Sequence, residues 1–94
     1  MRSTRRYRIS GRVQGVGFRA FVWRTAREVD VDGWVRNRHD GTVEALVSAS
    51  PDKHELLLTS LEQGPRMSRV DRVEVTEDVR NDDFPRGFEV RRDA

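Results

Sequence analysis

The chain has 94 residues, of which 36% are charged, and its 18 basic and 16 acidic side chains leave a formal net charge of +2. This near balance argues against a nucleic-acid-binding tail, which would show a clear basic excess. The chain also has no cysteine and no apolar stretch long enough to span a membrane, so we expect one soluble, cytoplasmic domain over residues 1–94, with a core over about 5–92.

The first third of the chain predicts a strand, a glycine-rich turn and a helix. Residues of opposite polarity alternate from Arg5 to Val13, as in a half-buried strand. A turn with glycine at positions 15 and 17 follows, and apolar residues then recur at helical spacing from Arg19 to about Val29. The helix face expected to be buried consists of Phe18, Val22, Thr25, Ala26 and Val29.

The rest of the chain predicts a β-hairpin, a second helix and further strands. Strands over 34–39 and 42–48 flank Asp40-Gly41, which is a strong two-residue hairpin signal. Ser50 and Pro51 are a helix N-cap and first helical residue, and Gly64-Pro65 ends that helix. The remaining expectations are a strand over 69–75 with Val73 and Val75 facing inward, a loop over 81–85, and a short last strand marked by Phe88 and Val90.

The predicted order is strand, helix, strand, strand, helix, strand, with a possible extra edge strand. This is the split βαβ (βαββαβ) pattern of ferredoxin-like α+β domains. The hairpin at Asp40-Gly41 makes its two strands antiparallel, so we expect a mostly antiparallel sheet of four to five strands. Two helices would then cover one face of this sheet, forming a two-layer sandwich.

The turn between the first strand and the first helix, GRVQGVGFR over 11–19, is the most informative segment. Gly15 and Gly17 allow backbone conformations closed to other residues, so that consecutive amide N–H groups can form an anion-binding nest. The helix start adds unpaired N–H groups, and the guanidinium of Arg19 can grip two oxygens of one phosphoryl group. The pattern favours an anion site, although such turns also occur without function and would then leave Arg19 an ordinary surface residue.

Other ligands fit the same segment less well. Residues 15–20 match the dinucleotide pattern G-x-G-x-x-[GA], with Asp40 as a possible ribose-binding acid, but the chain is too short for that fold and Asp40 is better explained by the hairpin. A Walker A loop is excluded because no Gly-Lys-Ser/Thr occurs. RNA binding is disfavoured because the strand over 42–48 has no aromatic residue and Tyr7 belongs to the buried side of its strand.

Two motifs in the sequence resemble those of the acylphosphatase family. The family loop G-x-V-Q-G-V-x-F-R matches residues 11–19 throughout, and the family motif G-[FYW]-V-[KR]-N-x-x-x-G-x-V matches residues 33–43. Later segments are also similar, so the resemblance covers the chain from Tyr7 to Val90. One departure is Ala49, because the family usually has glycine just after the third strand; we expect a small change in that turn and no loss of the site.

The resemblance implies a ferredoxin-like hydrolase that splits the carboxyl-phosphate bond of acyl phosphates into a carboxylate and inorganic phosphate. It also implies that Arg19 and the loop amides bind the phosphate and that Asn37 positions the attacking water. The loop residues concerned are Gln14, Gly15, Val16, Gly17, Phe18 and Arg19. We expect a monomer whose partners are the acyl phosphate and inorganic phosphate, as product and inhibitor, with no metal, cofactor, nucleic acid or membrane.

Two other functions remain open. One is a regulatory module that binds phosphate or an acyl phosphate without useful turnover, although such a module would not need Asn37. The other is the N-terminal acylphosphatase-like domain of a larger carbamoyl-phosphate-handling protein, as in hydrogenase maturation, against which the short self-contained chain argues. Small acyl phosphates, carbamoyl phosphate and aspartyl-phosphate groups on proteins all fit the phosphate loop.

The remaining titratable side chains are expected to be structural or solvated. His39 lies beside the hairpin and His54 on the second helix, and neither belongs to a recognisable triad or metal-ligand spacing, so we expect both to be solvated. The acids Asp52, Glu55 and Glu62 are expected on an exposed helix face.

Overall fold

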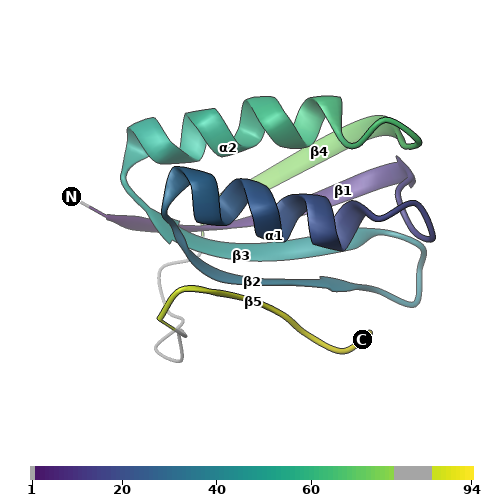
Figure 1. Cartoon of the computed structure of the whole chain (residues 1–94), viewed down its shortest axis with the longest axis horizontal. Helices are drawn as coiled ribbons and strands as arrows, with labels where there is room; N and C mark the ends of the chain where they lie inside the picture. Colours follow the sequence, from purple (N-terminus) through teal and green to yellow (C-terminus); the bar gives the residue numbers. More distant parts are fainter. Residues whose placement is uncertain (1, 78–85) are drawn as a thin grey trace.

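The computed structural model describes residues 2–77 and 86–94, and the predicted loop over 81–85 lies outside these residues. The elements are β1 (Ser3–Arg12), α1 (Phe18–Val29), β2 (Asp32–Asn37), β3 (Val43–Ala49), α2 (Pro51–Gln63), β4 (Arg69–Glu77) and β5 (Phe88–Val90). This order confirms the predicted ferredoxin-like α+β fold, with β5 as the extra edge strand (Figure 1).

The strands form one sheet in the order β4-β1-β3-β2-β5. β1 runs antiparallel to both of its neighbours, so that Tyr7 pairs with Ala45 of β3 on one side and with Val75 of β4 on the other. β2 and β3 are antiparallel, as the predicted hairpin requires, although residues 38–42 connect them and not Asp40-Gly41 alone. β5 pairs parallel with β2. The sheet is therefore mixed and mostly antiparallel. Because β1 and β2 both run antiparallel to β3, their C-terminal ends lie at the same edge of the sheet, on either side of β3.

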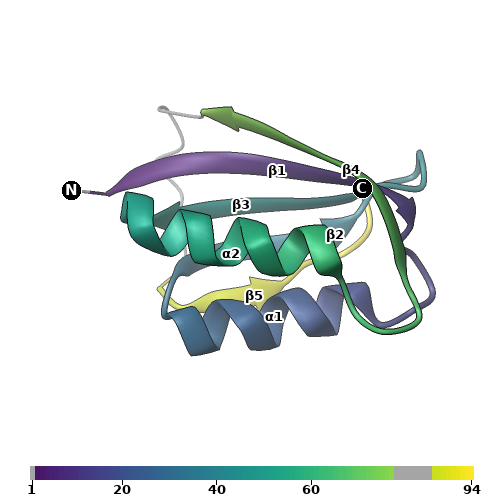
Figure 2. The same cartoon turned by 90° about the horizontal axis from the view of Figure 1, so that it is seen from above.

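Both helices cover one face of the sheet and leave the other face open (Figures 1 and 2). Phe18, Val22 and Ala26 of α1 are buried against the sheet, as their helical spacing predicts. The buried apolar cluster between the layers consists of Tyr7, Ile9, Val13, Phe18, Val22, Ala26, Val31, Val35, Val43, Ala45, Val47, Ala49, Leu57 and Leu61. Within the described part of the chain, neither helix is long and apolar enough to cross a membrane.

On the open face, arginine side chains surround the buried carboxylate of Glu44. This side chain is only 1% exposed, and it accepts hydrogen bonds from Arg36 Nε at 2.8 Å and Arg38 Nη1 at 3.2 Å, besides a contact with Arg6. Burial alone would raise the pKa of Glu44, but the surrounding guanidinium groups hold it below its usual value. Glu44 therefore stays ionised at neutral pH. Its arginine partners cover the face of β3 that no helix covers.

Val75 is more exposed than its alternation predicts. It shares the helix side of β4 with Val73, which packs against the core as expected, but Val75 itself is 41% exposed. β4 is an edge strand of the sheet. Val75 is therefore on the predicted side of the strand but is not covered, because alternation identifies the face of a strand and not whether a helix covers each part of it.

His54 is fully buried, so the prediction that it is solvated is wrong, whereas His39 is exposed as expected. The Nδ1 atom of His54 lies 2.7 Å from Tyr7 Oη, and Nε2 lies 2.8 Å from Ser3 O. A carbonyl can only accept, so Nε2 donates to Ser3 and Nδ1 accepts from Tyr7, whose pKa burial raises to about 12. The missed signal is spacing, since His54 precedes Leu57 and Leu61 by one and two helical turns.

We expect the free energy of unfolding to decrease as the pH falls below about 6.5. Burial lowers the pKa of His54, so the unfolded chain takes up a proton at a higher pH than the folded protein does. This contribution to stability is complete above the unfolded pKa and is lost as the pH falls from there toward the folded value. Urea unfolding between about pH 7.5 and about pH 5 measures the slope.

The variant His54→Gln should flatten this part of the pH dependence, because glutamine does not titrate. The matched variant His39→Gln, at an exposed position, should keep the wild-type slope. Equal slopes in wild type and His54→Gln would show that His54 does not cause the effect.

Ala49 is accommodated at the end of β3 without strain. It is buried and paired with Ser3 of β1. Among the non-glycine residues in 2–77 and 86–94, only Asp30 has a positive φ. The backbone at Ala49 is therefore one that alanine adopts readily.

Candidate active site

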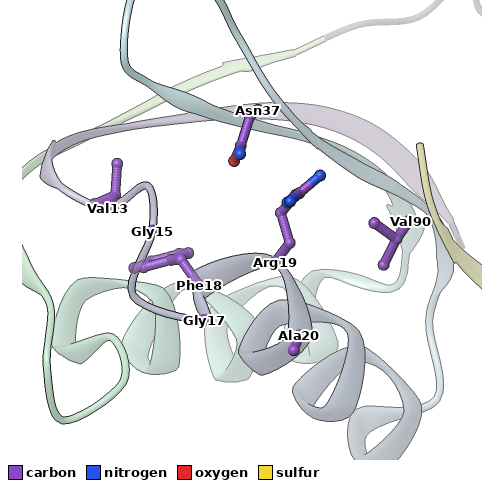
Figure 3. A pocket seen from close by; sticks show the side chains of 8 residues that line it. All are labelled: Val13, Gly15, Gly17, Phe18, Arg19, Ala20, Asn37 and Val90. Carbon is purple, nitrogen blue, oxygen red and sulfur yellow. The ribbon is translucent and has the colours of Figure 1, made fainter. Parts of the chain in front are cut away.

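The predicted phosphate loop borders a hollow at the start of α1 (Figure 3). The hollow has a volume of about 330 Å³ and is lined by Val13, Gly15, Gly17, Phe18, Arg19, Ala20, Asn37 and Val90. It brings together the loop after β1, the first turn of α1, and the ends of β2 and β5. Figure 3 shows the side chains of Arg19 and Asn37 projecting into the same space from opposite sides.

The loop owes its shape to two glycines in the left-handed region. Gly15 has φ of 74° and Gly17 has φ of 78°, and a Cβ atom at either position would meet nothing within 4 Å. Glycine is therefore favoured by backbone conformation and not by crowding. Gly17 is also the N-cap of α1 and supplies no side-chain cap, so the first N–H groups of the helix have no intrahelical partners. The residues of this first turn line the hollow.

Two loop side chains anchor the loop and do not line the hollow. Gln14 Nε2 donates hydrogen bonds to Arg38 O at 2.7 Å and Thr42 O at 2.9 Å, which ties the loop to the β2–β3 hairpin. Val16 packs against the apolar core. Of the predicted loop residues, Gly15, Gly17, Phe18 and Arg19 line the hollow.

Arg19 lies in the first turn of α1 and is the one charged residue among the described residues that line the hollow. Its side chain is 39% exposed, and its Nη1 atom lies 3.2 Å from Asp93 Oδ1. This contact leaves other N–H groups of the guanidinium fork able to bind a ligand. Sequence reasoning missed Asp93, because it lies 74 positions from Arg19 and outside both motifs.

Asn37 is the last residue of β2 and is 8% exposed. It alternates with Arg36 and shares the helix side of the strand with Val35. Its backbone O accepts a hydrogen bond from Ala94 N at 2.9 Å, which holds the strand end in place. A side-chain amide that both donates and accepts thus lines the hollow together with N–H donors and one guanidinium, an arrangement suited to an anion and a water.

No group of three or more His, Cys, Asp or Glu side chains within residues 2–77 and 86–94 is arranged to hold a metal ion. The polar groups that line the hollow are instead the guanidinium of Arg19, backbone amides and the side-chain amide of Asn37, and they come from a loop, a helix start and a strand end. This geometry can bind a small anion and place a neutral molecule against it.

Comparisons with known proteins agree with the family that the motifs resemble. The acylphosphatase family model matches residues 5–90. An acylphosphatase of Salinibacter ruber is 49% identical over 85 residues, which are 90% of this chain and 88% of that protein. An acylphosphatase of Koribacter versatilis is 57% identical over 72 residues, which are 77% of this chain and 66% of that protein.

Solved structures share the fold over nearly the whole chain. The acylphosphatase from Bacillus subtilis has a TM-score of 0.87 at 34% identity, covering 96% of this chain and 98% of that one. Full-length HypF in its phosphate- and nucleotide-bound form has a TM-score of 0.88 at 25% identity, covering 99% of this chain but 12% of that one. The chain is thus similar to a protein of nearly its own length and to one segment of a much larger protein.

Proposed function

The chain belongs to the acylphosphatase family, hydrolases of the carboxyl-phosphate bond of acyl phosphates, and on this premise we propose that hydrolysis takes place in the hollow at the start of α1. The observation that supports the proposal is the convergence of Arg19, the glycine turn and Asn37 on one hollow. The glycine turn and Arg19 belong to the first sequence motif, and Asn37 at the end of β2 belongs to the second, so each motif contributes one side of the hollow.

In this proposal the phosphoryl group lies between the N–H groups of the loop and the guanidinium of Arg19. The left-handed glycines turn the loop around the hollow, and the helix start adds unpaired N–H groups and a favourable dipole. Gln14 keeps the loop at a fixed distance from the strand end that bears Asn37, because its side chain donates to Arg38 O and Thr42 O in the connection between β2 and β3. The phosphoryl group would therefore enter a cradle already shaped for it.

Arg19 and the loop N–H groups would stabilise the negative charge on the equatorial oxygens of the phosphoryl group in the transition state. Phosphoryl transfer passes through a loose transition state, with charge spread over three equatorial oxygens. Preorganised N–H donors act most strongly on such charge, because they need no reorganisation at the moment of reaction. The departing carboxylate is a weak base, so it leaves without a general acid.

Asn37 would align the attacking water opposite the leaving carboxylate. Its amide can accept a hydrogen bond from the water and donate one to an oxygen of the phosphoryl group. Alignment is most of what the water needs, since the chemistry depends on positioning. A phosphoryl oxygen of the substrate would then take the proton of the water, and inorganic phosphate and a carboxylate would leave.

The test is hydrolysis of benzoyl phosphate without added metal and with inorganic phosphate as competitor. We expect turnover that inorganic phosphate inhibits competitively, because product and substrate share one phosphate site. The alternative is a regulatory module that binds phosphate in the same cradle. Phosphate binding without benzoyl phosphate turnover would support that alternative and overturn catalysis in the hollow.

A further inference from the structure

A carboxylate that the proposed mechanism does not use lies against the proposed phosphate-binding arginine. Asp93 Oδ1 is 3.2 Å from Arg19 Nη1, with the two side chains 54% and 39% exposed. Within residues 2–77 and 86–94, Arg19 is the one charged residue lining the hollow, so Asp93 is an anion paired with the charge that the phosphate would use.

The backbone around Asp93 is held against β2. Arg91 N donates to Val35 O at 2.8 Å, and Ala94 N donates to Asn37 O at 2.9 Å. Residues 91–94 lie outside the strand but follow β2 beyond Val90, where the pairing of β5 with β2 ends. Figure 1 shows this last stretch of the chain lying alongside β2. The side chain of Asp93 can rotate, but its backbone cannot leave the edge of the hollow unless these hydrogen bonds break.

A phosphate in the hollow would have to share Arg19 with this carboxylate. The negative charge of Asp93 offsets part of the attraction that Arg19 exerts on an anion, and it repels the anion directly. Both side chains are partly exposed, so solvent and salt weaken these interactions without abolishing them. The expected effect on phosphate affinity is therefore modest, and it should decrease as the salt concentration rises.

We propose that Asp93 is an affinity-determining residue that weakens the binding of phosphate dianions in the hollow, so that inorganic phosphate leaves readily after hydrolysis. The inference rests on the proposed function, because it takes the hollow as the phosphate site. Weaker binding that affects substrate and transition state alike leaves turnover at saturation unchanged. Asp93 would therefore limit product inhibition at little cost in maximal rate.

The test is the affinity of the whole chain for inorganic phosphate, measured by titration calorimetry in wild type and Asp93→Asn. Asparagine keeps the size of the side chain and an oxygen that can accept from Arg19, but it removes the charge. We expect phosphate to bind about two- to fivefold more tightly to Asp93→Asn at low ionic strength, with the gain shrinking as salt is added.

Asp52→Asn is the matched control, since it removes the same charge from an exposed position in the first turn of α2. Figure 1 shows α2 beginning at the end of the molecule opposite the start of α1. The phosphate affinity of this variant should equal that of wild type.

Unchanged or weaker phosphate binding in a folded Asp93→Asn protein would overturn the inference, and weaker binding would mean that Asp93 orients Arg19. The variant Arg19→Ala distinguishes this failure from that of the proposed function. Loss of phosphate binding in Arg19→Ala without a gain in Asp93→Asn contradicts the role of Asp93 alone. Wild-type phosphate affinity in Arg19→Ala contradicts the proposed site itself.

Discussion

Replacing Arg19 with alanine should lower the turnover of an acyl phosphate by at least ~10²–10³-fold and remove most of the affinity for inorganic phosphate. The reason is that, in the part of the chain that the structure describes, Arg19 is the one charged residue lining the hollow. Its guanidinium would contact the phosphoryl group in both ground and transition states. Steady-state kinetics with benzoyl phosphate and calorimetry with inorganic phosphate measure the two effects separately.

Two further variants test whether the position of Arg19 and the planar geometry of its guanidinium matter in addition to its charge. Arg24→Ala removes the same charge from an exposed position on the same helix and should leave both quantities unchanged. Arg19→Lys keeps the charge but loses the planar fork, so it should fall between wild type and Arg19→Ala. Near-normal phosphate affinity in Arg19→Ala would contradict the assignment of this residue.

Replacing Asn37 with alanine should lower turnover by about 10²-fold while phosphate affinity stays within about twofold of wild type. Asn37 would contact the attacking water, whereas the loop and Arg19 would provide most of the contacts to phosphate. The kcat for benzoyl phosphate and the inhibition constant of inorganic phosphate give the two numbers from one set of assays.

The stability of Asn37→Ala needs its own measurement, because Asn37 is nearly buried at the end of β2. Its backbone hydrogen bond from Ala94 does not depend on the side chain, so we expect the strand end to keep its place. A urea unfolding curve checks this before the kinetics are interpreted. Near-normal turnover in the folded variant would rule out a water-positioning role.

The sequence predicted the fold well wherever the signal was local. The hairpin at Asp40-Gly41, the helix starting at Pro51 and the alternation of β1 are each encoded in a few adjacent residues, and together they determine the order of elements. Ser50 is the N-cap of α2 as predicted, although its side chain makes no capping hydrogen bond. The family motifs then identified Arg19 and Asn37, which the fold brings to one hollow.

Contacts between distant segments could not be predicted from the sequence. Asp93 meets Arg19 across 74 positions and His54 meets Ser3 across 51, and neither pairing leaves a local pattern. The hydrogen bonds from Gln14 to the hairpin carbonyls likewise depend on the packed sheet, so the motif placed Gln14 in the phosphate loop without indicating that its side chain anchors the loop. The single-domain extent, the monomeric state, the cytoplasmic location and the roles of the site residues stay predictions.

Hydrolysis of benzoyl phosphate in water labelled with heavy oxygen tests most directly whether the water attacks a phosphoryl group held between the loop and Arg19. We predict that mass spectrometry will find the label in inorganic phosphate and none in benzoate, because Asn37 would direct the water at phosphorus. Label in benzoate would mean that the water attacks the carbonyl carbon. That result would contradict the placement of the phosphoryl group in the hollow between Arg19 and Asn37.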